Sequence, residues 1–395
     1  MTAGLRRTGQ RERRYRFGFV LNTTLGNLTR YQNLRKYAER DPEVACSWAP
    51  VSHYTPPDHP SRLRFLPEPL FMRVRVLQQA WPVLGSLDGL DAVMVHLFEA
   101  DVLCCLRRYV AKRPLHISSN DEAPIIDRAT YPLYPHELAK PVWRQKLRLA
   151  IDHWRVRQTD EFIPFSRWVS RVLVEHCSAP PDRVHPIHVG IDLELWKPRP
   201  PLARPSGDGR LRILFVGGDF ERKGGELLLD VFRRRFQDVA ELHLVTRQAP
   251  AELPSNVHVH ADFHPNDERL TDLYATCDVV VVPTFADIGP LWVFMEAMAM
   301  GLPIIGTDTG ANTELVRHGQ TGLIVGIGNG EELAAAIETL LANPEERRRM
   351  GQRGRALIES EYSASDNVPR ILATMKRAVD RASGVTAFSA QPGEV

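Results

Sequence analysis

The chain has 395 residues, of which 43% are hydrophobic and 25% are charged, an ordinary composition for a globular protein of two domains. Its 50 Lys and Arg residues nearly balance its 48 Asp and Glu residues, and the net charge of +2 excludes recruitment of nucleic acid by a global positive field. The five cysteines lack metal-ligand spacing, and no apolar run is long enough to span a membrane, so we expect free thiols in a cytoplasmic chain.

The N-terminal arm, residues 1–14, is rich in arginine. One interpretation is a solvated arm, and the other is attraction to an anionic lipid surface, which would place the protein peripherally at the inner membrane face. The segment 62–81 also mixes arginines with large apolar residues. Core packing with solvated arginines and an interfacial membrane contact both account for that pattern.

The first half of the chain alternates strand-like and helix-like segments. Helices are expected after the first strand as far as Arg40, at 137–158, and at 166–176 with Ser166 as the N-cap. Such alternation is typical of a parallel sheet covered by helices on both faces. The expected strands are 17–21, 92–97, 114–118, 162–165 and 184–189.

A Pro- and Gly-rich stretch at 197–210 is the best candidate linker, and a second alternating series follows it. We therefore predict an α/β protein of two doubly wound, Rossmann-like domains that face a cleft, residues 1–200 and 201–365, with a final helix at 366–382 and a disordered tail at 383–395. The expected strands of the second domain are 212–216, 241–246, 257–260, 279–282, 303–306 and 322–325, and its last helices are 331–342 and 345–360.

The segment 289–301 predicts a buried helix that contains one carboxylate. Pro290 suits the first helical position and Gly301 suits the end. Between them every side chain is apolar except Glu296. Burying a carboxylate is costly unless hydrogen bonds satisfy it. Glu296 is therefore either tied to nearby donors of the protein itself or reaches a pocket where a ligand donates to it.

The glycine-rich loop 216–225 lies between a predicted strand and a predicted helix. Its glycines allow a sharp turn and a close approach to a ligand, and Arg222 and Lys223 add two cations beside the helix start. The spacing matches neither the dinucleotide fingerprint nor the P-loop. Taken alone, Lys223 is equally well explained as a surface-loop lysine.

The loop that ends at the buried helix carries Asp287. The N–H groups of Leu291 and Trp292 come early in that helix, where no intrahelical acceptor exists, and they suit a pyrophosphate. Asp287 and Glu296 would then face one pocket and accept bonds from sugar or ribose hydroxyls. The alternative for Asp287 is an ordinary loop acid that satisfies the helix-start amides.

Four segments together resemble glycosyltransferase family 4: 186–198, 217–224, 283–303 and 310–325. The resemblance is clear over 162–365 and weak before it. It implies the GT-B fold and the retaining transfer of a hexose from a nucleoside-diphosphate sugar to an acceptor hydroxyl on a saccharide, a lipid or a small molecule. It also implies that no metal or other cofactor is needed, that the second domain holds the donor and the first the acceptor, and that the helix at 366–382 crosses back to the first domain.

The resemblance assigns roles residue by residue. Lys223 corresponds to the lysine at the donor diphosphate, Glu296 to the acid at the ribose, and Asp287 stands near the acid at the transferred sugar; with Asp121 these are the candidate catalytic residues. The acceptor side is expected to involve Thr24, Gly26, His96 and Asn120. The donor side is expected to involve Gly217, Gly218, Arg222, Lys223, Thr246, Gly289, Pro290, Leu291, Trp292 and Glu296.

The sequence departs from the family at several of these positions. Asp287 lies one residue too far from Glu296 for the family's spacing, and the family's donor-side arginine falls near Gly218, so Arg222 is its candidate replacement. His96 and His188 are open to two interpretations, a structural histidine or a contact in the cleft. The departures also leave two rival functions: a nucleotide-sugar-binding or regulatory protein that has lost turnover, and a nucleotide-sugar epimerase.

Overall fold

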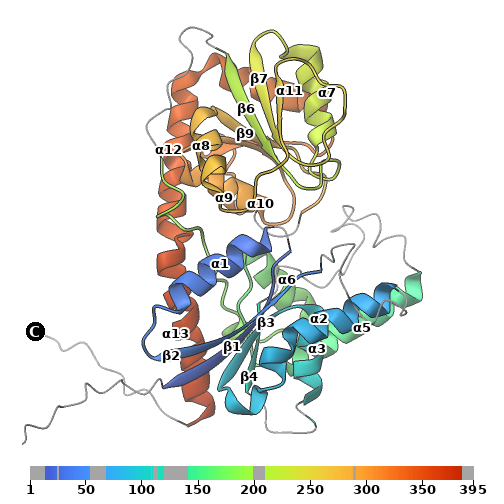
Figure 1. Cartoon of the computed structure of the whole chain (residues 1–395), viewed down its shortest axis with the longest axis vertical. Helices are drawn as coiled ribbons and strands as arrows, with labels where there is room; N and C mark the ends of the chain where they lie inside the picture. The colour runs from blue at the N-terminus through green and yellow to red at the C-terminus, as the bar shows by residue number, and fades with distance from the viewer. Residues whose placement is uncertain are drawn as a thin grey trace, which may run out of the picture.

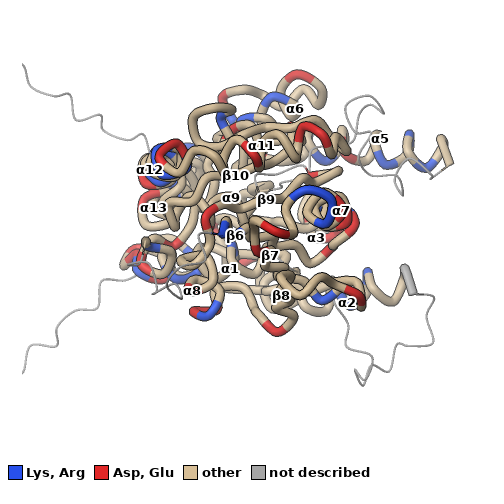
Figure 2. The backbone as a smooth tube through the Cα atoms, turned by 90° about the horizontal axis from the view of Figure 1, so that it is seen from above, with Lys and Arg blue, Asp and Glu red and all other residues tan. Residues whose placement is uncertain are grey.

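The computed structural model describes residues 14–24, 26–53, 68–107, 109, 114–119, 141–198, 210–287 and 291–384. It contains two parallel α/β domains stacked along the long axis of the molecule, with α12 (Pro344–Glu361) and α13 (Ala364–Ala382) running along one side of both (Figure 1). α12 carries charged residues of both signs (Figure 2). Among the described residues, no helix combines the length and the apolar character needed to cross a bilayer.

The N-terminal sheet has five parallel strands in the order β2-β1-β3-β4-β5. Its central strands are buried on both faces, as expected when helices cover a parallel sheet on both sides. Phe19 of β1, for example, pairs with Trp48 of β2 and Met94 of β3. The strands are β1 (Tyr15–Asn22), β2 (Val44–Val51), β3 (Ala92–His96), β4 (Leu115–Ser118) and β5 (Glu161–Phe162).

Helices and short 3-10 turns connect these strands. Ser166 caps α6 as predicted, because its Oγ accepts a hydrogen bond from the N–H of Val169 at 3.1 Å. The elements are α1 (Asn27–Ala38), α2 (Glu68–Leu84), η1 (Leu87–Gly89), α3 (Phe98–Arg107), α5 (Val142–Gln158), α6 (Arg167–Cys177) and η2 (Pro181–Arg183).

Two strand assignments from the sequence are wrong. The predicted strand at 184–189 is reduced to one bridge between Val184 and Phe162; His185 and Ile187 still donate their N–H groups to Phe162 and Pro164, but Pro164 has no N–H to continue the ladder. The strand β2 was not predicted at all, because its polar and proline residues give no clear alternation.

The C-terminal sheet has six parallel strands in the order β11-β10-β9-β6-β7-β8. Its centre is the fully buried strand β9, whose four residues are all valine. All six strands lie within about one residue of the predicted positions. They are β6 (Leu211–Val216), β7 (Ala240–Val245), β8 (Val257–His260), β9 (Val279–Val282), β10 (Ile304–Thr307) and β11 (Gly322–Val325).

Helices cover both faces of this second sheet. Figure 1 shows α7 and α11 on one side and α8, α9 and α12 on the other. Residues of α13 join the core of the N-terminal domain, where Val368, Ile371 and Met375 pack in one cluster with Phe17 and Ile117. The remaining helices of the domain are α7 (Gly225–Arg235), α8 (Glu268–Thr276), α9 (Trp292–Ala299), α10 (Asn312–Leu315) and α11 (Gly330–Ala342).

Candidate functional site

Two loops meet where the strand order of the C-terminal sheet reverses. The first loop follows β6 and the second follows β9, and these strands are neighbours although they are far apart in sequence. Ligands of doubly wound sheets bind at such a switch point, at the carboxyl ends of the strands. The topology therefore brings the predicted loops 217–225 and 283–287 to one crevice.

Gly224 lets the two loops touch. Its φ of +77° is in the left-handed region, which favours glycine. A Cβ at this position would lie 2.1 Å from the carbonyl oxygen of Pro283, so a larger residue would push the loops apart. The loops are joined further by the N–H of Phe285, which donates to the carbonyl of Arg222 at 2.9 Å.

The crevice gathers three of the predicted charged residues. Lys223 Nζ lies 2.9 and 2.8 Å from the two carboxylate oxygens of Asp287. Arg222 Nη1 lies 3.3 Å from the same carboxylate and also donates to the carbonyl of Ala286 at 2.6 Å, while Thr284 Oγ1 donates to Asp287 at 2.7 Å. Asp287 thus lies against both cations, and they hold it away from the helix-start amides.

Burial of Lys223 changes its acid–base chemistry. Desolvation lowers the pKa of Lys223, and the charge of Asp287 opposes that shift by favouring the ammonium form. Only 14% of the lysine side chain and 13% of the aspartate side chain are exposed. A desolvated cation of this kind interacts strongly with an anion that enters the crevice.

Glu296 is buried, as the sequence predicted, and a tyrosine satisfies it. Tyr274 of α8 donates its hydroxyl to Glu296 Oε2 at 2.8 Å. Burial raises the pKa of Glu296 to about 7, and the hydrogen bond from Tyr274 opposes that shift. Tyr274 in turn packs edge-on against Trp196, with the ring centroids 5.3 Å apart. Sequence reasoning missed Tyr274, because this partner of Glu296 lies on a different helix, 22 residues earlier in the chain.

The start of α9 faces the N-terminal domain. A Cβ on Gly26 would lie 2.9 Å from Cδ1 of Trp292, and the ring of His188 lies 5.1 Å from the indole. The predicted availability of the Leu291 amide is not observed, because that N–H points at Asn312 Oδ1, 3.4 Å away. Asn312 is the first residue of α10, 21 residues further along the chain, and sequence reasoning did not identify it as a partner.

The other donor-side residues take the following places. Gly217 is buried and Gly218 is exposed in the turn after β6. Thr246 directly follows β7 and its Oγ1 accepts the N–H of Gln248 at 3.2 Å. Gly289 and Pro290 lie outside the described residues.

The acceptor-side residues line the corresponding switch point of the N-terminal sheet, between β1 and β3. Thr24 lies after β1, and its Oγ1 accepts the N–H of His53 at 3.1 Å. His96 ends β3 and its ring lies 5.4 Å from that of Phe165. Asn120 and Asp121 lie outside the described residues. Sequence reasoning missed Arg30, which is buried, lies 3.7 Å from the centroid of the Phe165 ring and donates to Ser119.

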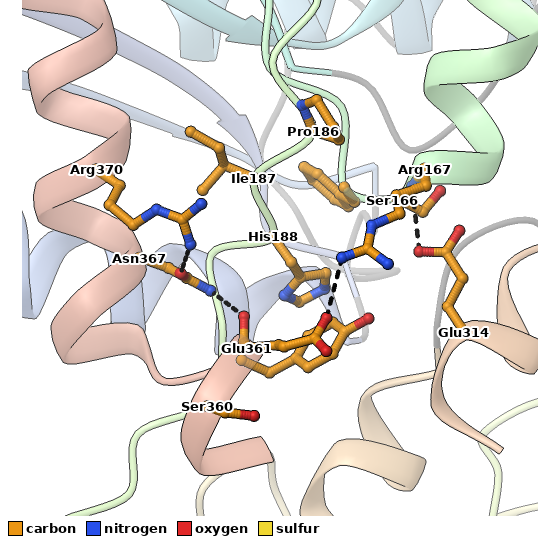
Figure 3. Close-up of a pocket in the computed structure, with 12 residues that line it drawn as sticks. Ser166, Arg167, Pro186, Ile187, His188, Glu314, Ser360, Glu361, Asn367 and Arg370 are labelled. Atoms are coloured by element: carbon orange, nitrogen blue, oxygen red, sulfur yellow. Dashed lines mark hydrogen bonds and ion pairs between the residues drawn. The ribbon is translucent and has the colours of Figure 1, made fainter. Parts of the chain in front are cut away.

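A pocket between the domains was also not anticipated (Figure 3). Glu314 of α10 reaches across the domain boundary and accepts the N–H groups of Arg167 and Trp168 at 3.1 and 2.7 Å, so it caps α6 together with Ser166. Arg167 also pairs with Glu361 of α12 at 3.2 Å. Sequence reasoning did not single out Glu314, although it lies in the segment 310–325, one of the four segments that resemble the family.

The class of protein follows from this geometry: two doubly wound domains whose switch-point crevices face each other form the GT-B fold. Sucrose-phosphate synthase of Thermosynechococcus elongatus has the same fold, with a TM-score of 0.75 at 18% identity over 93% of this chain and 100% of that chain. A structure of Anabaena HepE in complex with UDP-glucose gives a TM-score of 0.62 at 15% identity over 94% of this chain and 100% of that chain.

The sequence comparisons narrow the class of protein further than the fold does. Residues 210–343 match the family model described as Glycosyl transferases group 1. The chain is 30% identical over 238 residues to MMP alpha-(1->4)-mannosyltransferase of Mycolicibacterium hassiacum, across 57% of this chain and 56% of that protein. It is 28% identical over 210 residues to D-inositol 3-phosphate glycosyltransferase of Rhodococcus jostii, across 48% of this chain and 46% of that protein.

These matches confirm the predicted resemblance to GT-B glycosyltransferases of the family 4 type. The chain spans about half the length of these two curated relatives. The match to the family model lies within the C-terminal domain, which contains the charged crevice.

Proposed function

We propose that this protein is a retaining hexosyltransferase, which moves a hexose from a nucleoside-diphosphate sugar to the hydroxyl of an acceptor. The observation that carries the proposal is the cluster of Lys223, Arg222 and Asp287 at the switch point of the C-terminal sheet. Two desolvated cations at the carboxyl ends of parallel strands suit a diphosphate. The names of the curated relatives, several of them glycosyltransferases, support the same reaction class.

In this proposal, Asp287 holds the two cations in place until the donor binds. The diphosphate of the donor then takes over Lys223 and Arg222, and the freed carboxylate accepts a hydrogen bond from a hydroxyl of the hexose. The exchange leaves each buried charge with an ion-pair or hydrogen-bond partner at every stage, which matters because a buried charge without a partner is costly.

The chemical step needs stabilisation of a leaving group. The bond between the anomeric carbon and the diphosphate oxygen breaks, and a bond from the acceptor oxygen forms on the same face of the sugar. The acceptor proton moves to the departing phosphate oxygen. Lys223 and Arg222 stabilise the charge that develops on the diphosphate, and fixed cations of this kind commonly provide the largest part of catalysis.

Glu296 has a role at the ribose. A ribose hydroxyl that donates to its carboxylate favours the ionised form, and it would therefore lower the pKa of Glu296 from about 7. Burial of Glu296 within 2.8 Å of the Tyr274 hydroxyl fixes the direction of its carboxylate before the donor arrives. On the acceptor side, Thr24, Gly26 and His96 belong to the facing crevice.

The experiment measures transfer from UDP-, GDP-, ADP- and dTDP-hexoses to a panel of acceptors, with thermal-shift screening to find the donor first. The anomeric configuration of the product is then read by NMR. We expect one donor base to be preferred, the anomeric configuration of the donor to be kept, and no loss of turnover with a chelator. Inversion at the anomeric carbon would contradict the proposed step.

The two rival functions give different results in the same assay. A binding or regulatory protein would bind a nucleotide sugar without turning it over under any condition, and an epimerase would change the free sugar without needing an acceptor. The paired cations at the crevice favour the transferase, since they suit the stabilisation of a departing diphosphate.

We further propose that the N-terminal domain makes a peripheral contact with a membrane. Near the start of α5, Val142, Trp143 and Leu147 are 53–62% exposed, and Trp81 of α2 is 65% exposed. Arg144, Lys146 and Arg148 lie between the apolar residues of α5. Basic residues interleaved with exposed apolar residues along the start of α5 suit an anionic bilayer. Co-sedimentation with anionic but not with neutral vesicles, reduced in Trp143→Ala, tests this contact.

A further inference from the structure

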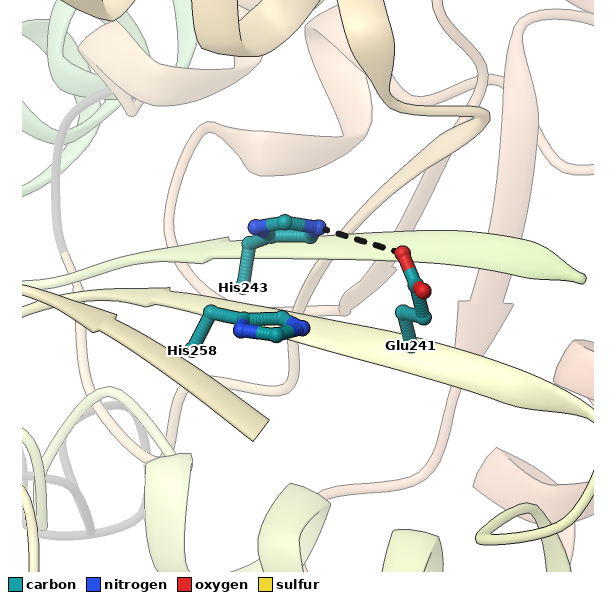
Figure 4. Close-up of side chains that lie close together, drawn as sticks. All are labelled: Glu241, His243 and His258. Carbon is teal, nitrogen blue, oxygen red and sulfur yellow. Dashed lines mark ion pairs between the residues drawn. The ribbon is translucent and has the colours of Figure 1, made fainter. Parts of the chain in front are cut away.

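Glu241, His243 and His258 gather on one face of the C-terminal sheet, on β7 and the edge strand β8 (Figure 4), and a third histidine, His260, stacks on His243. His243 of β7 is directly opposite His258 of β8 in the parallel register. Side chains two residues apart on a strand share a face, so Glu241 lies beside His243, and His260 lies beside His258. None of these residues belongs to the crevice described above.

The distances bring metal-binding atoms together. Glu241, His243 and His258 each offer one oxygen or nitrogen atom, and these atoms all lie within 4.8 Å of one another. Glu241 Oε2 lies 3.8 Å from His243 Nε2, which is too long for a hydrogen bond. The rings of His243 and His258 are stacked, with centroids 5.0 Å apart and planes at 28°.

The contact of His243 Nδ1 determines which nitrogen of the ring has a lone pair for a metal ion. His243 Nδ1 lies 3.2 Å from His260 Nε2, so one of these two atoms donates to the other. If Nδ1 carries the proton, the lone pair of Nε2 points toward Glu241. That Nε2 is buried and has no hydrogen-bond partner within the part of the chain that the structure describes. A buried imidazole nitrogen without a partner needs an explanation, and a missing metal ion is one.

We propose that Glu241, His243 and His258 bind a divalent transition-metal ion, with Zn²⁺ as the best match. Two imidazoles and one carboxylate are a common three-ligand set for zinc, and bond lengths of about 2.0–2.2 Å require the ligand atoms to close in slightly from their present spacing. The exposed side of His258 leaves a fourth position for water. Nickel and copper would bind the same set in the usual order of affinity.

Two neighbours would orient the ligands. Arg212 of β6 donates Nε to Glu241 Oε2 at 3.0 Å, and the same oxygen lies nearest His243 Nε2, so Arg212 fixes the direction of the carboxylate. His260 holds His243 and is itself stacked on Phe263, with centroids 5.2 Å apart. Partners of this kind fix the ring orientation and the tautomer of a metal-binding histidine. The ion would join the edge strand β8 to β7, away from the reacting groups.

The test is calorimetric titration of the whole chain, freed of metal by a chelator, with ZnCl₂. The key variant is His258→Ala, because this side chain is exposed and its loss leaves the fold in place. The matched control is His264→Ala, an exposed histidine of the same domain outside the cluster. We expect one saturable site in the wild-type chain and in His264→Ala, and binding at least about tenfold weaker in His258→Ala.

Two further measurements make the result specific. Co²⁺ in place of Zn²⁺ should give the visible absorption of a tetrahedral site in the wild-type chain and lose it in His258→Ala. Zinc should also raise the unfolding temperature of the wild-type chain more than that of His258→Ala, since a ligand that binds only the folded state stabilises it. Equal zinc affinity in the wild-type chain and His258→Ala, or no saturable binding up to about 1 mM zinc, would overturn the proposal.

Discussion

The two domains have the same kind of crevice but different side chains in it. In the C-terminal domain, the switch point between β6 and β9 holds Lys223, Arg222 and Asp287 in mutual contact. In the N-terminal domain, the switch point between β1 and β3 is flanked by Thr24, which accepts the N–H of His53, and by His96, whose ring lies near that of Phe165. The topology thus provides two places for a ligand, and among the described residues the C-terminal one places two cations against one carboxylate.

The comparison also shows how the two crevices meet. Trp292, at the start of α9 in the C-terminal domain, lies against Gly26 in the loop after β1. Glu314 and α13 tie the domains together behind this contact. A change on either side of the cleft is therefore expected to affect binding on its own side first.

The largest effect is expected from Lys223→Ala. Removal of the buried cation takes away stabilisation of the departing diphosphate and leaves Asp287 with Arg222 and the hydroxyl of Thr284. We expect turnover to fall by about a hundredfold or more, as when one group that stabilises developing charge is removed. Lys197→Ala removes an exposed lysine and serves as the control. Steady-state kinetics with the best donor give the comparison, and turnover within a factor of three of wild type would contradict the role of Lys223.

The next effect concerns the contact between the loops. Gly224→Ala places a Cβ 2.1 Å from the Pro283 carbonyl at a φ of +77°, whereas Gly301→Ala has the same φ of +77° with no atom within 4 Å. The second variant isolates the backbone strain, which costs about 1 kcal/mol. In urea unfolding, we expect Gly224→Ala to lower the free energy of unfolding by roughly 2 kcal/mol more than Gly301→Ala does. Gly224→Ala should also weaken donor binding, while Gly301→Ala leaves donor binding unchanged. Equal losses in the two variants would show that the loops need not touch.

Glu296→Gln separates function from stability. We expect turnover to fall by about tenfold, or roughly 1.4 kcal/mol of barrier, because the amide accepts ribose hydroxyls less well than a carboxylate. Burial raises the folded pKa of Glu296 to about 7 from its ordinary value of 4.5, so the folded state binds the proton more tightly than the unfolded state. Wild-type stability should therefore fall as pH rises from about 4.5 to 7 and level off above that.

The glutamine variant should not show this part of the pH dependence. Urea unfolding at pH 5 and pH 8 measures it: we expect the variant to gain stability relative to wild type at pH 8 but much less at pH 5. A constant difference between the two proteins across this range would mean that Glu296 is not held in a desolvated site.

The smallest effect is expected on the acceptor side. Gly26→Ala would place a Cβ 2.9 Å from Trp292, whereas Gly89→Ala in the same domain meets no atom within 4 Å. We expect the first variant to raise the acceptor KM about threefold, or roughly 0.7 kcal/mol, with the donor Kd unchanged. A change in donor affinity larger than the change in acceptor KM would show that Gly26 acts in donor binding rather than in acceptor binding.

Local pattern predicted most of the C-terminal domain. Its strands are short, apolar and bounded by Gly, Pro and Asp, so they were found within about one residue. The N-terminal domain was harder, because β2 lacks alternation and the expected strand at 184–189 pairs through only one bridge, at Val184. An edge strand is paired on one side only, and its sequence is less constrained by burial.

What the sequence by itself determined is the chemistry available: a cationic glycine-rich loop, an acid before the buried helix, and Glu296 as the one charge within it. What only the tertiary structure decided is the partner of each charge. Asp287 pairs with Lys223, 64 residues away, and Glu296 pairs with Tyr274 on another helix. Pairing across loops and helices depends on strand order, and strand order is set by packing of the whole sheet rather than by any local segment.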